Sequence, residues 1–186
     1  MFFGAGNRSY SGNDSYRHID PLIRGGKTIY IVSPYIDSYY AAFIRRYAGG
    51  KRFYILSSSM TDSARKILES KGDALGIFLF SGVVAAIDIL VYLLGLLSVY
   101  IILLSLAAIG ARWIVFKLAS RNRIVLKVPK SFVHAKLYVS DRMAILGSAN
   151  LTYKGTHVNV EHIEVVHEPD RIGLLKKEFW KLWEEA

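Results

Sequence analysis

The feature that most constrains this chain is a run of thirty-eight residues, 74–111, in which Asp88 is the only charged residue. A helix needs about 20 apolar residues to cross a bilayer, so the run is too long for one crossing and long enough for two. We predict transmembrane helices at 74–94 and 96–117, with the turn at Gly95. The alternative is a buried hairpin in a globular core, which is disfavoured because helices of soluble proteins normally carry a polar face.

Basic residues gather on both sides of this run. Residues 1–73 carry eleven Lys and Arg against six Asp and Glu, and residues 112–186 carry thirteen against eight. Because positive charge is retained on the cytoplasmic side of membrane proteins, the bias predicts that both ends of the hairpin lie in the cytoplasm. The same excess suits polyanionic partners such as nucleic acid or an anionic lipid surface, and the sequence leaves both explanations open.

The part of the chain before the run has a pattern of alternating strands and helices. The β-branched and aromatic stretches "KTIYIVS" and "KRFYILS" predict two buried strands. Each is followed by a helical segment: "DSYYAAFIRRYA", which Asp37 or Ser38 is expected to cap, and "TDSARKILES", which Thr61 or Asp62 is expected to cap. This alternation predicts an α/β fold, a parallel or mixed sheet flanked by helices. Residues 1–15 are rich in Gly, Ser and Asn, and we expect no regular structure there.

After the run, short apolar stretches predict further strands at "RIVLKV", "HAKLYVS", "MAILGS" and "HIEVVHE". The residues Ser140–Asp141–Arg142 form the predicted tight turn between the second and third of these strands. The sequence therefore predicts the N-terminal half of an α/β domain at 1–73, a transmembrane hairpin at 74–118, and the C-terminal half of the same domain at 119–186.

The chain closes with an amphipathic helix, "DRIGLLKKEFWKLWEEA", which we expect Asp170 to cap. Its apolar residues recur at helical spacing and form one stripe, which comprises Ile172, Leu175, Phe179 and Leu182. A stripe of this kind predicts that the helix packs on the sheet.

Two patterns resemble ligand sites but have the wrong spacing. "RGGKT" matches the last three residues of the phosphate-binding loop pattern Gly-x4-Gly-Lys-Thr, but Pro21 stands where the first glycine is needed. A strand also follows this segment, whereas in such loops the strand comes first. His157, His162 and His167 cannot converge on a metal, because His162 has the opposite parity on a strand. The chain has no cysteine, which excludes disulfides and thiolate ligands. We therefore expect neither a metal nor a cofactor.

Polar side chains interrupt the apolar stretches "VHAKLYV" and "AILGSANL". His134 and Lys136 are two residues apart on a predicted strand, so both project from one face, and Ser148 and Asn150 end the next strand. A histidine serves as nucleophile or general acid, and the other three side chains donate hydrogen bonds that suit a phosphoryl oxygen. Glu161, on the following strand, is placed to orient the imidazole. These five residues are the candidate catalytic set.

The same residues carry a family resemblance. "HAKLYVSD" fits the His-x-Lys-x4-Asp pattern, and "GSANLT" the Gly-Ser-x-Asn element, of the phospholipase D superfamily, which the sequence resembles. The eleven-residue step from Asn150 to Glu161 is similar to that of the small bacterial endonucleases of this superfamily. The resemblance covers essentially all of the chain outside the hydrophobic run, which is an insertion relative to the family.

The resemblance implies a phospholipase D-like fold and a metal-independent phosphodiesterase that acts through a phosphohistidine. His134 would attack phosphorus, Lys136 and Asn150 would hold the phosphate with help from Ser148, and Glu161 would orient His134.

The resemblance also implies a partner and a choice of substrates. The family needs two motifs for one active site and this chain has one, so we expect a homodimer with the site on its two-fold axis. Asp141 would be structural. Nucleic acid is the favoured substrate because both soluble segments are basic. Membrane phospholipid stays open, because a tethered site on the cytoplasmic side would meet lipid head groups, and a non-catalytic membrane scaffold is the third possibility.

Overall fold

The computed structural model describes residues 7–70, 74–93, 99–119 and 124–186. The chain divides into two compact units, one made of Met1–Ser70 with Arg123–Ala186 and the other of Lys71–Asn122. Gly95, the expected turn of the hairpin, lies outside the described residues.

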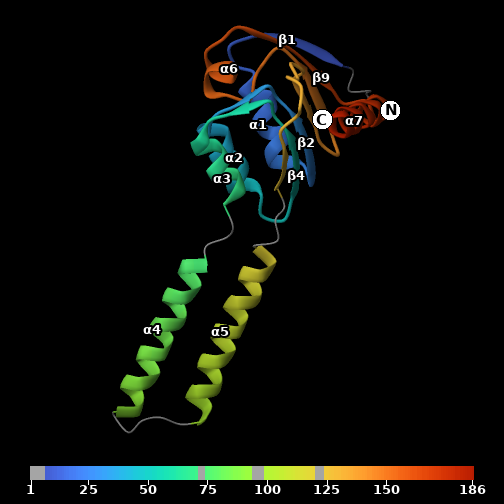
Figure 1. Ribbon diagram of the computed structural model, residues 1–186. Coiled ribbons are helices and arrows are strands. Elements are labelled where there is room, and N and C mark those ends of the chain that lie inside the picture. Colours follow the sequence, from blue (N-terminus) through green and yellow to red (C-terminus); the bar gives the residue numbers. More distant parts are fainter. Residues whose placement is uncertain (1–6, 71–73, 94–98, 120–123) are drawn as a thin grey trace. The chain divides into compact units, whose positions relative to one another are not determined.

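The first unit is built on a seven-stranded sheet with the order β1-β9-β8-β7-β2-β4-β6 (Figure 1). Strands β2, β4 and β6 are parallel, and each of the other neighbouring pairs is antiparallel. The strands are β1 Arg8–Gly12, β2 Thr28–Val32, β4 Arg52–Leu56, β6 Ile124–Lys127, β7 Leu137–Val139, β8 Ala144–Gly147 and β9 Glu161–Val166. Two further strands, β3 Tyr35–Ile36 and β5 Ser59–Met60, pair with each other. The predicted mixed sheet is confirmed.

Helices cover both faces of this sheet. The first face carries α1 Tyr16–Gly25, α2 Ser38–Tyr47 and α3 Asp62–Glu69, and the second carries α7 Pro169–Glu185 (Figure 1). Alternate residues of one strand serve the two cores: Ile31 packs with the α1–α3 layer, whereas Val32 packs with α7. Phe53 and Leu56 divide in the same way on β4.

The predicted helix starts are right in two cases and wrong in one. The Asp37 side chain accepts from the Tyr40 N–H at the start of α2, and Thr61 accepts from the Ala64 N–H at the start of α3. Asp170 does not cap α7, because the helix begins at Pro169 and Asp170 already lies in the first turn. The predicted stripe is confirmed: Ile172 and Phe179 are buried, and Leu175 and Leu182 pack against them.

Strand β1 was not expected, because residues 1–15 were predicted to be irregular. It pairs with β9 from Arg8↔Val165 to Gly12↔Glu161. Its sequence, "RSYSG", has no run of apolar residues, and the backbone hydrogen bonds offered by the edge of β9 decide its conformation.

The second unit contains two helices, α4 Ala74–Leu93 and α5 Val99–Ala119. They contact one another through the Ser105 hydroxyl, which donates to Asp88 Oδ1 at 2.8 Å, and through the Arg112 guanidinium, 4.9 Å from the Phe80 ring centroid. Within the part of the chain that the structure describes, no helix has the length and apolarity needed for a membrane span. The predicted transmembrane helices at 74–94 and 96–117 are therefore not supported.

Several chain segments end or begin at one edge of the sheet, and this edge holds the candidate site. Strands β2 and β4 end there because they are parallel, and β7 begins there because Leu137 pairs with Val32 at the end of β2. Strand β8 ends and β9 begins at the same edge, since Gly147 pairs with Ile163. In α/β sheets the carboxyl ends of parallel strands are the usual place for a ligand.

Candidate active site

His134 and Lys136 lie at this edge, in the segment that leads into β7. The prediction that they lie on a strand is wrong, because β7 begins at Leu137 and residues 132–136 have no regular structure. The two side chains still meet: Lys136 Nζ lies 3.1 Å from Nε2 and 3.3 Å from Nδ1 of His134, and it donates to the His134 carbonyl at 3.0 Å. The Lys136 side chain thus folds back on the His134 residue and places its positive charge beside an exposed imidazole.

Two contacts hold this irregular segment in place. The Val133 N–H donates to Ser58 Oγ at 2.8 Å, and Ser58 Oγ lies 3.1 Å from the Val133 carbonyl. The exposed ring of Phe132 stacks on His134 with centroids 6.1 Å apart, and it also lies against Tyr35. The segment is therefore fixed by side chains that follow β2 and β4, not by a strand ladder.

Gly147 lets the next site residue approach β9 closely. Its φ is +155°, and a Cβ there would lie 2.1 Å from the His162 carbonyl oxygen. No residue with a side chain fits that approach. The glycine of the Gly-Ser-x-Asn element thus brings Ser148 against β9, where the His162 N–H donates to Ser148 Oγ at 3.0 Å.

Ser148 and Glu161 are joined directly. The Ser148 hydroxyl donates to Glu161 Oε2, and Asn159 Nδ2 donates to Glu161 Oε1 at 3.1 Å. Both carboxylate oxygens are therefore occupied, and the described hydrogen bonds of Glu161 do not include His134. Glu161 is connected to the imidazole only indirectly, through its electrostatic interaction with Lys136.

That charge acts on the lysine. Partial burial lowers the pKa of Lys136 below its ordinary value, and the negative charge of Glu161 opposes the shift. Lys136 therefore interacts electrostatically with Glu161 while the Nζ atom of Lys136 contacts His134. A cation, an imidazole and a carboxylate are gathered at one edge.

Asn150 is the residue with an unused hydrogen-bonding atom. Its Oδ1 is buried and has no hydrogen-bond partner among the described residues. The backbone on both sides is fixed, because the Tyr138 hydroxyl donates to the Ala149 carbonyl at 2.7 Å and the Leu151 N–H donates to Ser33 Oγ at 3.0 Å. A buried polar atom without a partner is costly and calls for an explanation, such as a bound ligand with a hydrogen-bond donor. A phosphoryl oxygen would instead be held by Asn150 Nδ2, because the phosphoryl oxygen and Oδ1 are both acceptors.

Asp141 has a different role from the other motif residues. Its Oδ1 accepts from the Lys27 N–H at 2.8 Å, at the opposite end of β7 from the site. Burial acts to raise its pKa, but hydrogen bonds from the backbone N–H groups of Lys27 and Asp141 itself, with the charges of Arg142 and Lys176, outweigh it and hold the pKa below its ordinary value. Asp141 thus ties the β7–β8 turn to the start of β2.

The structure brings the five candidate residues to one edge through two contacting pairs, His134 with Lys136 and Ser148 with Glu161, and one residue with a free acceptor, Asn150. Sequence reasoning missed the residues that hold them, namely Ser33, Ser58 and Asn159. The sequence could have indicated Ser33 and Ser58, since both follow the end of a predicted parallel strand, where ligand sites usually lie. Asn159 had none, because it follows a short helix, α6 Tyr153–His157, which the sequence did not predict.

A comparison with protein families found one match within the chain. Residues 98–183 match the family model described as "Cardiolipin synthase, PLD-like domain". This part of the chain contains all five candidate residues and Asp141. This part of the chain is therefore similar to a phospholipase D-like domain. No curated protein sequence matches the chain.

Solved structures share the fold. The chain is similar to Nuc from Salmonella typhimurium, a phospholipase D family member, with 13% identity, a TM-score of 0.55, and coverage of 96% of this chain and 95% of that one. NucT from Helicobacter pylori gives 13% identity, a TM-score of 0.54 and coverage of 96% of both chains. Phosphatidylserine synthase from Haemophilus influenzae gives 13% identity and a TM-score of 0.53, but the 96% of this chain that matches spans only 38% of the synthase.

Proposed function

We propose that the protein is a metal-independent phosphodiesterase that acts through a phosphohistidine on His134. The observation that carries the proposal is the contact between Lys136 Nζ and the His134 imidazole, 3.1 Å apart, at the sheet edge that also holds Asn150. A nucleophile needs a phosphoryl group held and neutralised next to it, and an ammonium with amide and hydroxyl donors provides this.

The reaction runs in two steps with a second histidine. A ring nitrogen of His134 bonds to phosphorus while the bond to the leaving oxygen breaks, and that oxygen takes a proton from the other histidine. Water then attacks the phosphohistidine, returns a proton to the second histidine and releases the phosphate product with His134 restored. Lys136 and the side-chain amide Nδ2 of Asn150 hold the phosphoryl oxygens. Ser148 helps when its one hydroxyl hydrogen turns from Glu161 to the phosphate, and the charge of Glu161 acts on Lys136.

The second histidine comes from a second copy of the chain in this proposal. Its support is a set of large apolar side chains left exposed around the site edge, where a partner would cover them: Tyr35 at 45%, Phe132 at 57%, Val158 at 55% and Val160 at 80%. A two-fold axis through the edge would bring the two imidazoles together.

Mixed dimers test this assembly. When wild-type and His134→Ala subunits are exchanged in equal amounts, a site that needs both histidines leaves about one quarter of the wild-type activity, since only one dimer in four is intact. Independent sites would leave half, and that result would contradict the shared site.

Nucleic acid is the substrate that we propose. The formal net charge is +9 at pH 7, and both segments outside the hydrophobic run are basic. The proposal also draws on the similarity of fold to two small proteins, Nuc and NucT, whose chains are matched over 95% and 96% of their length.

A second candidate, cleavage or transfer at membrane phospholipid, has its own support. The family model refers to cardiolipin synthase, and one similar fold is a phosphatidylserine synthase. We also propose that the hairpin attaches the protein to a membrane, with the phosphodiesterase on the cytoplasmic side. The support is the single charge in residues 74–111 and the exposed apolar side chains on both helices, among them Leu79, Ile89 and Leu104.

One substrate panel tests both candidates. Purified protein in detergent with EDTA, beside His134→Ala, is offered labelled DNA, RNA, and vesicles of phosphatidylcholine or cardiolipin. We expect cleavage of nucleic acid that depends on His134. Release of a head group instead would support the phospholipid candidate. No His134-dependent turnover on any substrate would contradict the enzyme and favour a non-catalytic membrane scaffold.

A further inference from the structure

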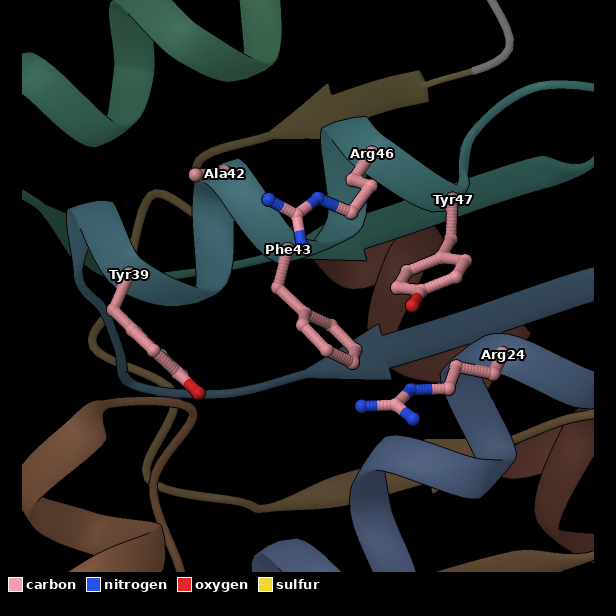
Figure 2. Close-up of a pocket in the computed structure, with 6 residues that line it drawn as sticks. All are labelled: Arg24, Tyr39, Ala42, Phe43, Arg46 and Tyr47. Atoms are coloured by element: carbon pink, nitrogen blue, oxygen red, sulfur yellow. The ribbon is translucent and has the colours of Figure 1, made fainter.

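A pocket of about 310 Å³ lies on the outer side of the helices α1 and α2, away from the five candidate catalytic residues. Arg24 of α1 and Tyr39, Ala42, Phe43, Arg46 and Tyr47 of α2 line it. Figure 2 shows the three aromatic side chains projecting from α2, with the Arg24 guanidinium close to Phe43 and Tyr47. The volume is at the lower end of the range for small-ligand sites. None of these residues takes part in the proposed phosphodiester chemistry.

The two arginines of this pocket differ in how they are engaged. The Arg24 guanidinium lies 5.1 Å from the Phe43 centroid and 5.5 Å from the Tyr47 centroid, and it pairs with Asp20 at 3.5 Å. Arg46 is exposed, and within the described residues its side chain makes no hydrogen bond, ion pair or ring contact. The Arg24 guanidinium thus lies against the aromatic wall of the pocket, whereas the Arg46 guanidinium has no partner among the described residues.

Aromatic rings continue from the pocket to the short helix α6. Tyr39 lies edge-on to Tyr153 at 5.2 Å and to His157 at 5.5 Å. Tyr153 is three residues after Asn150, and its N–H donates to Asp37 Oδ2 at 2.6 Å. Tyr39 and Tyr153 remain 42% and 49% exposed although they pack on each other. A strip of partly exposed aromatic surface thus runs from the pocket to α6, the helix that follows Asn150 in the chain.

We propose that this strip and its pocket bind a single-stranded segment of nucleic acid, with bases stacked on the exposed tyrosines and a phosphate held by Arg46. The proposal deepens the proposed function and rests on nucleic acid being the substrate. Aromatic platforms interleaved with arginines are how proteins hold single strands, because unpaired bases expose their faces and every base can stack. A lipid head-group phosphate would pair with the arginines but would offer no ring to stack on the tyrosines.

Binding of fluorescent oligonucleotides tests the proposal. The full chain in detergent, carrying His134→Ala so that the probe stays intact, is titrated with oligothymidylate and with an abasic oligomer of equal length. We expect Tyr39→Ala to weaken oligothymidylate binding about fivefold or more, since base stacking on a ring is lost, while abasic binding is unchanged. Tyr39→Phe keeps the ring and should keep the affinity.

Arg46 is tested by the dependence of binding on salt. Arg46→Ala should reduce the slope of log affinity against log salt by about 0.7, the value for one phosphate contact with a single strand. The matched control is Arg65→Ala, which removes the same charge from an exposed position on α3 outside the pocket and should change the slope less. Equal thermal melting of all variants shows that they are folded.

Two outcomes of these titrations would overturn the inference: equal oligothymidylate binding by Tyr39→Ala and its parent, or an equal effect of Arg46→Ala and Arg65→Ala on the salt slope. A third would come from a parallel titration with anionic vesicles, if the variants lose binding to the vesicles alone. The last would make the pocket a head-group site. Failure of the proposed function is distinct, because a protein that cleaves nothing can still lose oligothymidylate binding in these variants. Conversely, His134-dependent cleavage with unchanged binding by the variants would contradict only this inference.

Discussion

Two polar clusters of this protein differ in how completely their hydrogen bonds are satisfied. Between α1, α2 and α6, the Tyr40 hydroxyl lies 3.0 Å from both Asp20 Oδ1 and Thr156 Oγ1, and Thr156 Oγ1 lies 2.7 Å from His157 Nδ1. This buried cluster is closed, because each of these groups has a partner within the protein. At the sheet edge, the buried Oδ1 of Asn150 has none.

The difference separates a structural network from a site prepared for a ligand. A buried network that is fully satisfied makes the packing specific and stable. A site must instead keep some hydrogen-bonding capacity free, at a cost in stability, so that the substrate can use it. We therefore expect substitutions at the sheet edge to change activity and substitutions in the closed cluster to change stability.

The largest effect is expected for His134→Ala. Loss of the nucleophile should reduce phosphodiester cleavage at least about 10³-fold. The free energy of unfolding should change by no more than about 0.5 kcal/mol, because the side chain is exposed. Initial rates and chemical denaturation measure the two quantities, and a rate within tenfold of wild type would show that His134 is not the nucleophile.

Asn150→Ala should separate activity from stability most clearly. The loss of one preorganised contact to the phosphoryl group is expected to lower the turnover rate about 10²–10³-fold. Stability should not fall by the usual cost of a lost hydrogen bond, because the Oδ1 atom makes none in the free protein. A large drop in unfolding free energy with normal activity would reverse the assignment of the two clusters.

The closed cluster should respond in the opposite way. Tyr40→Phe removes the hydroxyl that both Asp20 and Thr156 approach, so we expect the unfolding free energy to fall by about 1–3 kcal/mol with little change in turnover. Burial raises the pKa of Asp20, and the hydrogen bond from Tyr40 opposes that shift. Tyr39→Phe, which removes a partly exposed hydroxyl, is the control, with a change within about 0.5 kcal/mol.

The smallest effect concerns Asp141 and pH. Because its folded pKa is depressed, the carboxylate stabilises the fold above its unfolded pKa, and this contribution is lost as the pH falls through the folded value. Wild type should exceed Asp141→Ala in stability at pH 7, by a modest amount because the side chain is 37% exposed, and the two should converge below about pH 4. Denaturation curves at several pH values measure this, and a difference that persists in acid would contradict the ionic contribution.

The sequence predicted the parts of the fold that depend on local patterns. The strands β2 and β4, the caps Asp37 and Thr61, and the apolar stripe of α7 all follow from periodicity and capping chemistry. Strand β1 could not be predicted, because its conformation depends on the distant edge of β9 rather than on its own residues.

The candidate site residues could be singled out from the sequence, but the contacts between them could not. The types and spacing of His134, Lys136 and Asn150 singled them out, whereas the irregular backbone at residues 132–136 depends on Ser58, seventy-five residues away from Val133 in the chain. The bond of Glu161 to Ser148 was also missed, because it depends on the close approach of β8 and β9 at Gly147. Long-range contacts of this kind leave no periodic signal in a single sequence.

The most direct test of the central claim is to trap the covalent intermediate. Substrate and enzyme are mixed, quenched rapidly at alkaline pH and digested, and the peptide 131–136 is examined by mass spectrometry. The account predicts that this peptide carries the phosphoryl portion of the substrate on His134 through an acid-labile bond. The longer peptide 131–142 of Lys136→Met should carry none, because the lysine holds the phosphate during attack. Active enzyme with an unmodified His134 peptide throughout turnover, or with the adduct on another residue, would contradict the phosphohistidine mechanism.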